Sequence, residues 1–304
     1  MLKNELGRKW RDIPWDDVLQ QRATADKYFM RSGLIRKDLL PQYALEHTPP
    51  TFVVSSIDDL DTALNQINDD DKSSDVDSMW VLKLCDSSNA FGIHIFHGRN
   101  KRSIYSILDD MERRVLQKYV SPMLYGDKKF HLRVLVLAVG HLDVYVFEDC
   151  RMLVASAPFS TDCLDSLVHI TNQSTNRAGN PRYEERSQNV LLRDAAAFPP
   201  DFEVATMSQV HNICRDTFRR VARNRRHFFS LPNCYELFGL DFMVDVTGRV
   251  WLLEVNPDPS LGMFHGRGVV PATVLEAGGV PSSFTRVYSL GREEAFAKLK
   301  RDGC

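Results

Sequence analysis

Two carboxylates and a carboxamide near the end of the chain have a spacing that could hold a metal ion. Asp241 lies in the segment FGLDFMVD, and Glu254 and Asn256 lie in WLLEVN. Both segments are rich in β-branched and aromatic residues, and Thr247-Gly248 between them favours a hairpin turn. With this turn, Asp241 faces Glu254, and Asn256 shares their face because side chains alternate along a strand.

The chemistry of this acidic face follows from its charge. Like charges directly opposite one another destabilise a sheet, so a half-buried pair must share a proton, meet a cation or bind a metal. Oxygen ligands without His or Cys suit a hard cation such as Mg²⁺, which proteins usually hold with one or two carboxylates and substrate phosphates. The pattern predicts a platform for a nucleotide and its metal, with Met243 or Leu252 packed on the base. A carboxylate pair neutralised by a nearby Arg or Lys is the alternative.

The opposite face of the same hairpin must anchor these groups. In the register set by a Thr247-Gly248 turn, the core face is wholly apolar and consists of Leu240, Phe242, Val244, Trp251, Leu253 and Val255. Pro257 ends the strand because proline has no backbone N–H for a ladder.

Further elements are expected to complete the structure around this hairpin. Strands are predicted at 51–54, 79–84, 92–96 and 115–120, and a second hairpin at 130–148 with Gly140-His141 as its turn. Helices are predicted from a Ser55 or Ser56 cap to 67, over 34–40 up to Pro41, over 104–113 and over 203–229. The polar residues 173–189 are predicted to form a mobile loop, either a functional lid or an insertion.

Two sets of arginines have more than one interpretation. Arg133 lies inside the apolar strand LRVLVL, where a guanidinium is costly unless it is paired, so it either serves a substrate or neutralises a carboxylate. Arg215, Arg219 and Arg223 form an i,i+4 stripe on the predicted helix. Such a stripe is either a solvated face or a surface for an acidic partner.

The overall composition is that of a soluble globular protein. The chain has 304 residues, 43% of them hydrophobic, and a net charge of −2, so nucleic acid is not an expected partner. The six cysteines are scattered without a CxxC pair, which disfavours a zinc site or a disulfide scaffold and favours a reducing compartment. The start of the chain lacks a targeting segment, and the longest apolar stretch, 134–139, is too short to span a membrane. The expected location is the cytoplasm.

Several motifs occur in one order along the chain: KLCDSSNAFGI, QKYV, SPMLYGDKKFHLR, HITN, FGLDFMVD and WLLEVN. In this order they resemble the tubulin–tyrosine ligase-like family of ATP-grasp ligases, from about Leu34 to about Pro259. The resemblance implies an α+β fold with the nucleotide cleft between two lobes that each carry an antiparallel sheet. It implies a shortened N-terminal lobe over 1–75, a central lobe over 76–124 and a C-terminal lobe over 125–304 that carries the metal site.

The resemblance also implies roles for the matching residues. Lys83 would meet phosphates, residues 118–120 would read adenine through their backbone, and His169 would support the reaction site. The expected nucleotide-binding residues are Lys83, Gln117, Lys118, Tyr119, Val120, Lys129, His131 and Met243. The expected catalytic residues are Arg133, Thr171 and Asn172, and the expected Mg²⁺ ligands are Asp241, Glu254 and Asn256.

The implied reaction is ATP- and Mg²⁺-dependent formation of an amide bond. A protein carboxylate becomes an acyl-phosphate, and the amine of an amino acid displaces phosphate, so no protein nucleophile is needed. The family suggests tubulin, or another protein with an acidic tail, as the acceptor, and a link to the cytoskeleton.

Three positions depart from the family pattern. Asn89-Ala90 replaces a basic residue and glycine in the loop after Lys83, and His131 replaces an acid. Leu153 replaces an arginine that helps the tyrosine ligase hold its substrate. These departures favour, as an alternative, a nucleotide-binding or catalytically weakened scaffold protein of the same fold, and an ATP-grasp ligase of small molecules is a further alternative.

Overall fold

The largest element of the fold is an antiparallel sheet built around one long strand. A computed structural model describes residues 3–5, 8–70, 78–87, 90–110, 112–264 and 279–291. In the large sheet the strands follow the order β11 (Asn189–Leu191), β10 (Arg151–Val154), β8 (Lys128–Val139), β12 (Tyr235–Val244) and β13 (Val250–Asn256). Strand β9 (Asp143–Phe147) pairs with β8 and with β14 (Phe284–Ser289), and β7 (Leu124–Tyr125) pairs with β8.

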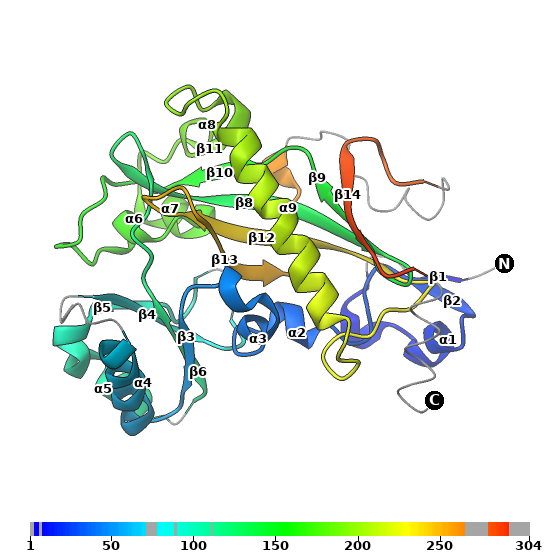
Figure 1. The fold of residues 1–304 in the computed structure, drawn as a ribbon, viewed down its shortest axis with the longest axis horizontal. Coiled ribbons are helices and arrows are strands. Elements are labelled where there is room, and N and C mark those ends of the chain that lie inside the picture. Colours follow the sequence, from blue (N-terminus) through cyan, green and yellow to red (C-terminus); the bar gives the residue numbers. More distant parts are fainter. Residues whose placement is uncertain are drawn as a thin grey trace.

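Every residue of β12 is buried, because both faces of the large sheet are covered at this strand. Helix α9 (Phe202–Val221) packs along one face, and its apolar residues join those of β8, β12 and β13 in the main core (Figure 1). The helix predicted over 203–229 is therefore present but ends at Val221. The 130–148 hairpin is confirmed, with β8 and β9 joined through 140–142.

The acidic hairpin differs from the predicted one in its turn. Asp245 and Arg249 are hydrogen-bonded through their backbones, so the loop has three residues, 246–248, with Gly248 at a φ of 85°. The Asp245 carboxylate accepts hydrogen bonds from the backbone N–H groups of Thr247 (2.8 Å) and Arg249 (3.0 Å), which stabilises the longer loop. This loop shifts the register by one residue, and Phe242 pairs with Leu252.

A β-bulge at Leu253 then restores the predicted pairing of Asp241 with Glu254. The predicted faces are wrong between the loop and the bulge. Leu252 is fully buried in the main core, whereas Leu253 lines a cavity on the other face and Trp251 is partly exposed there. Without the bulge, the three-residue loop would place Glu254 on the core face.

A smaller four-stranded antiparallel sheet faces the end of the large one. Its strands follow the order β3 (Thr51–Val54), β6 (Arg114–Lys118), β4 (Met79–Leu84) and β5 (His94–His97), close to the predicted strands. Helix α4 (Ile57–Asp70), the 3₁₀ helix η3 (Gly98–Ile104) and α5 (Tyr105–Leu108) cover one face. The helix predicted over 104–113 is thus only the short α5, which ends at Leu108, and the 3₁₀ helix η3 precedes it. Strand β3 and helix α4 lie before residue 75 in the sequence and belong to this small layer. The lobe boundaries predicted at residues 75 and 124 stay a prediction.

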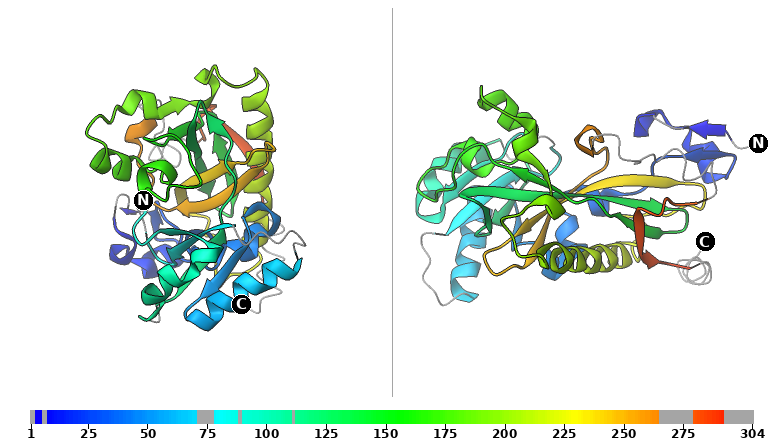
Figure 2. Two further views of the ribbon diagram at one scale, coloured as in Figure 1. Left: turned by 90° about the vertical axis from the view of Figure 1, so that its left-hand side faces the viewer. Right: turned by 90° about the horizontal axis from the view of Figure 1, so that it is seen from above.

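The N-terminal segment wraps along the large sheet. It contains β1 (Lys3–Glu5), η1 (Trp10–Asp12), α1 (Trp15–Leu19), β2 (Ala23–Ala25), α2 (Ser32–Ile35), α3 (Leu40–Ala44) and η2 (Leu45–His47). Figure 2 shows β1, β2 and α1 at the end of the large sheet opposite β4 and β5. Pro41 lies in the first turn of α3, so it starts a helix where the sequence analysis expected it to end one.

The segment 173–189 is largely helical, so the prediction of a loop is wrong. It forms α7 (Gln173–Gly179) and α8 (Glu185–Gln188) after α6 (Ser166–His169). Asn176 is buried, donates hydrogen bonds to the carbonyls of Ile170 (2.8 Å) and Asn172 (3.0 Å), and accepts one from Ser156 N–H (2.9 Å). These bonds fix the polar segment without an apolar stripe. Among the described residues, no single helix is both long enough and apolar enough to cross a bilayer.

Candidate active site

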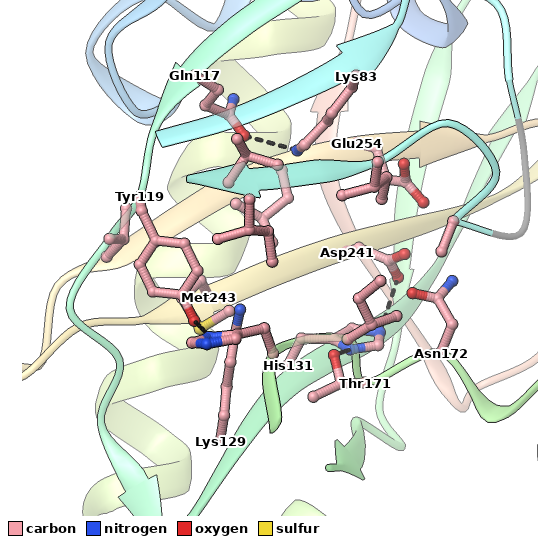
Figure 3. A pocket seen from close by; sticks show the side chains of 18 of the residues that line it. Lys83, Gln117, Tyr119, Lys129, His131, Thr171, Asn172, Asp241, Met243 and Glu254 are labelled. Atoms are coloured by element: carbon pink, nitrogen blue, oxygen red, sulfur yellow. Dashed lines mark hydrogen bonds and ion pairs between the residues drawn. The ribbon is translucent and has the colours of Figure 1, made fainter. Parts of the chain in front are cut away.

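The two sheets enclose a cleft with a third wall from the segment around α6 (Figure 3). The small sheet supplies apolar residues and Lys83, and the chain leaving β6 forms one edge. The large sheet supplies polar side chains from three adjacent strands. The lining residues include Val81, Lys83, Ile95, Gln117, Lys118, Tyr119, Val120, Lys129, His131, His169, Ile170, Thr171, Asn172, Asp241, Met243, Leu253 and Glu254.

Two buried lysines place positive charge in this cleft. Lys83 Nζ donates to Gln117 Oε1 (2.7 Å), and Gln117 Nε2 donates to Thr51 Oγ1 (3.0 Å), so the amine is held by a fixed amide. Lys129 Nζ lies 4.4 Å from the centre of the Tyr119 ring. Burial lowers the pKa of Lys83 to about 8, and burial together with nearby Lys83 lowers the pKa of Lys129 to about 7. A polyanion bound next to these amines would favour their charged form.

A chain of hydrogen bonds fixes the third wall to the β6 edge. His169 Nε2 donates to the carbonyl of Cys163 (2.6 Å), which leaves Nδ1 to accept a hydrogen bond from the Tyr119 hydroxyl (2.8 Å). Burial lowers the pKa of His169, so the neutral ring that this network needs is favoured. The Tyr119 ring is thereby held beside Lys129 in the lining of the cleft.

His131 connects the third wall to the acidic face. Its Nδ1 lies 2.5 Å from Thr171 Oγ1, and its Nε2 lies 3.6 Å from Asp241 Oδ1. All three side chains are buried. An imidazole therefore stands between the hydroxyl and the carboxylate at the position where the resembled family has an acid.

Arg133 is paired with Asp241, which is directly opposite it on β12. Its Nε donates to Asp241 Oδ1, and its Nη2 donates to Asp241 Oδ2 (2.8 Å). Burial by itself would raise the pKa of Asp241, but the charges of Arg133 and His131 outweigh it and hold the pKa well below its ordinary value. The sequence left open whether a nearby arginine or lysine neutralises the carboxylate pair. Arg133 does so for Asp241.

The second carboxylate, Glu254, meets Asp241 through an amide. Asn256 Nδ2 lies 3.3 Å from Asp241 Oδ2 and 3.3 Å from Glu254 Oε1, so the three expected metal ligands lie together. Lys37 Nζ is 3.8 Å from Glu254 Oε2 and donates to the carbonyl of Ser87 (2.5 Å). In the described part of the chain, no cluster of three His, Cys, Asp or Glu side chains is arranged to hold a metal ion by itself. Asn256 presents its amide nitrogen to the carboxylates, so the three residues fit Mg²⁺ when the amide turns its oxygen toward them; phosphates and water would supply the remaining ligands.

A second cavity of about 820 Å³ adjoins the cleft at this acidic face. Asn172 and Glu254 line both spaces, so they mark the junction. The second cavity is lined by Arg133, Leu153, Asn172, Gln173, Ser174, Arg177, Glu185, Glu254, Asn256 and residues of the loop 257–263.

All the site residues expected from the sequence line one of these two spaces. Arg133 and Asn256 line the second cavity, and the others line the cleft. Lys37 was missed, because its partners Glu254 and Ser87 are distant in the sequence and no local pattern marks it. Leu253 was missed because it was assigned to the core; Val81 and Ile95 could have been found from their alternation along β4 and β5.

Comparison of the sequence with known proteins identifies a family. Residues 20–265 match the Tubulin-tyrosine ligase family. A probable tubulin–tyrosine ligase of Schizosaccharomyces pombe is 26% identical, over 83% of this chain and 75% of that protein. A probable tubulin polyglutamylase of Homo sapiens, TTLL2, is 30% identical over 60% of this chain but only 32% of that protein. The probable tubulin–tyrosine ligase PBY1 of Saccharomyces cerevisiae is 24% identical, and the chain spans 40% of its length.

One solved structure extends the comparison to the fold. The C-terminal domain of K. lactis Pby1, described as an ATP-grasp enzyme interacting with the mRNA decapping enzyme Dcp2, is 22% identical. It superposes with a TM-score of 0.66 over 95% of this chain and 88% of that domain. The α+β architecture with its cleft between two antiparallel sheets is therefore the ATP-grasp fold, and the chain belongs to the tubulin-tyrosine ligase family.

Proposed function

We propose that the protein is an ATP- and Mg²⁺-dependent carboxylate–amine ligase that adds an amino acid to a protein carboxylate. Members of this family and fold are ATP-dependent ligases. The observation that carries the proposal is the junction of the cleft and the second cavity at Glu254 and Asn172. A nucleotide in the cleft would direct its terminal phosphate to this junction, and the two co-substrates would meet it from the second cavity.

Each part of the cleft suits one part of ATP. Val81, Ile95, Met243 and Leu253 offer an apolar slot for a flat base, and the backbone of 118–120 offers hydrogen-bonding groups at its edge. Lys83 and Lys129 supply charge for the phosphates, and Asp241, Glu254 and Asn256 would hold Mg²⁺.

The chemistry needs no nucleophile from the protein. The acceptor carboxylate would take the terminal phosphate of ATP and release ADP, and an amine would then displace phosphate from the acyl-phosphate; bound Mg²⁺ would neutralise the charge of the transferred phosphate. The chain's own residues position these groups and stabilise the transferred charge. Arg133 lines the second cavity while it holds Asp241, so its guanidinium can also meet negative charge at the junction.

Nucleotide binding is tested by thermal unfolding with ATP, with and without Mg²⁺. The melting temperature of the wild type should rise with MgATP, and the rise should be reduced in Glu254→Gln. The matched control is Glu148→Gln, at an exposed position outside both cavities, which should respond as the wild type does. A wild type that gains no stability from MgATP would exclude the ligase proposal.

The acceptor and the amine are tested separately. The family suggests the acidic tail of tubulin and a cytoplasmic or cytoskeletal setting. Purified tubulin is incubated with the protein, MgATP and, in turn, each of a panel of radiolabelled amino acids, with Glu254→Gln as the control. Incorporation that depends on Glu254 supports tubulin as acceptor, and no incorporation from any amino acid argues against it.

One observation favours a second candidate, a nucleotide-binding scaffold without turnover. Leu153 is buried at the second cavity, where the tyrosine ligase has a substrate-binding arginine, and Arg133 is already paired with Asp241. A scaffold would give the MgATP-dependent thermal shift but no release of ADP with any amino acid and acceptor.

A further inference from the structure

A basic hollow lies at the end of α9, outside both the cleft and the second cavity. We call it the arginine hollow, and its volume is about 510 Å³. Its lining residues come from the loop after α9 and from the N-terminal segment just before α2. Figure 1 shows the end of α9 close to α2 and α3. The lining residues are Phe29, Met30, Arg223, Asn224, Arg225, Arg226 and Phe229, none of which lines the other two cavities.

The backbone around the arginine hollow is fixed before any ligand binds. Phe229 N–H donates to the carbonyl of Met30 (2.8 Å), which ties the loop after α9 to the N-terminal segment. Asn224 Nδ2 donates to the Tyr43 hydroxyl (2.9 Å), and Asn224 Oδ1 accepts from Arg226 N–H (3.1 Å). A fixed loop lowers the entropy cost of ordering a ligand.

The charge of the hollow is positive and uncompensated by its own lining. Three arginines and no carboxylate line it among the described residues. Arg223 and Arg226 are exposed, and neither forms an ion pair with a described carboxylate. The neighbouring Arg215 and Arg219 are different, since each lies within 3.5 Å of Asp216. The net charge of the chain is only −2, so this concentration of arginine is local.

The aromatic rings at the hollow already contact an arginine or other rings, which leaves less aromatic face for a ligand. The Arg225 guanidinium lies 4.4 Å from the centre of the Phe229 ring. Phe29 is stacked on Trp10 at 5.9 Å and contacts Trp15 edge-on at 5.3 Å. Sequence-tolerant binding of single-stranded nucleic acid needs open aromatic faces on which bases stack. The hollow therefore suits carboxylates around a small apolar anchor better than it suits bases.

We propose that the arginine hollow is a docking site for an acidic peptide segment of a partner protein, with one apolar side chain seated against Phe29 and Met30. Arg223 and Arg226 bind carboxylates through their planar forks, which match carboxylate geometry. This docking is independent of nucleotide and of catalysis, because the hollow shares no residue with the cleft.

The test is fluorescence anisotropy with a labelled oligoglutamate peptide that carries one central leucine. The double variant Arg223→Gln/Arg226→Gln should bind it at least about tenfold more weakly, because two charge-assisted contacts are lost. The matched control is Arg215→Gln/Arg219→Gln, which removes two exposed arginines from the same region and should leave affinity nearly unchanged. Raising the salt concentration should weaken wild-type binding.

Several outcomes would overturn the proposal: no binding of the peptide by the wild type, equal weakening in both double variants, or tighter binding of a single-stranded oligonucleotide than of the peptide. Unchanged melting temperatures in both variants show that the comparison reports binding. The Glu254→Gln variant should bind the peptide as the wild type does, so this test is independent of the ligase proposal.

Discussion

Arg133 on β8 and Asp241 on β12 are directly opposite one another, and the guanidinium donates two hydrogen bonds to the carboxylate. Both side chains are buried, so each charge depends on the other. The pair joins two neighbouring strands of the large sheet at the point where the expected metal ligands lie.

Removing only the arginine should be strongly destabilising. Arg133→Met leaves a buried carboxylate without its partner, and we expect a loss of about 3–5 kcal/mol in the free energy of unfolding. The double variant Arg133→Met/Asp241→Leu removes both charges and should recover much of this loss. Urea denaturation of the wild type, both single variants and the double variant completes the cycle. Additive losses would show that the two residues are not coupled.

The two cleft lysines should make nucleotide binding take up protons. Their pKa values, about 8 for Lys83 and about 7 for Lys129, lie below the ordinary lysine value of about 10.4. Without ligand, the unfolded chain therefore binds more protons above about pH 7, and these two residues should make stability rise from there towards about pH 10. A polyanion favours the charged amines. Proton uptake on MgATP binding can be measured by calorimetry at about pH 8 in buffers of different ionisation enthalpy. The wild type should take up protons, and the Lys129→Met variant should take up fewer. Equal uptake in the variant would exclude a role for Lys129.

Leu252 and Leu253 should differ in their effect on stability although they are adjacent. Leu252 is fully buried in the main core, so Leu252→Ala should cost about 2–5 kcal/mol. Leu253 lines the cleft on the opposite face, so Leu253→Ala should cost less than about 1 kcal/mol in ligand-free protein and weaken nucleotide binding instead. Thermal unfolding with and without MgATP measures both effects. The reverse order of stabilities would support a regular two-residue turn.

Glu236 should add a pH dependence of its own. It is buried beneath the N-terminal segment, where it pairs with Arg31 and accepts a hydrogen bond from Tyr28 N–H (3.0 Å). Burial, opposed by Arg31 and this bond, raises its pKa to about 8. Between its ordinary pKa and about 8 the native state holds the extra proton, so this group makes stability fall as pH rises.

The Glu236→Gln variant lacks this titration. From about pH 5 to 8, the unfolding free energy of the variant should therefore rise relative to that of the wild type. The expected rise is up to about 1.4 kcal/mol per pH unit. Denaturant unfolding across this range measures it, with the exposed Glu148→Gln as the matched control. Parallel curves for wild type and Glu236→Gln would show that the carboxyl titrates normally.

The sequence predicted the structure best where apolar residues or known motifs are concentrated. Apolar strands such as 79–84 and 51–54 were predicted correctly because short runs of apolar and β-branched residues are a strong local signal. The ordered motifs also brought the expected site residues to one region, since each motif lies on a strand or at its end.

Other features depended on contacts that are distant in sequence. The helices of 173–189 are fixed by Asn176, whose partners include the backbone of Ser156, and polar composition alone suggested a loop. Lys37 reaches Glu254 because α2 of the N-terminal segment lies against β13. The pairing of Arg133 with Asp241 required the order of β8 and β12 in the sheet, which the sequence does not state.

The loop at 246–248 and the bulge at Leu253 are two irregularities that cancel each other. In evolutionary terms each can be lost without the other by a single deletion. Removing one residue of the loop leaves Asp245 opposite Arg249, and removing Leu253 leaves Glu254 opposite Asp241. Only a change to a two-residue turn at constant chain length would have to remove the bulge at the same time, because otherwise Glu254 would move out of step with Asp241.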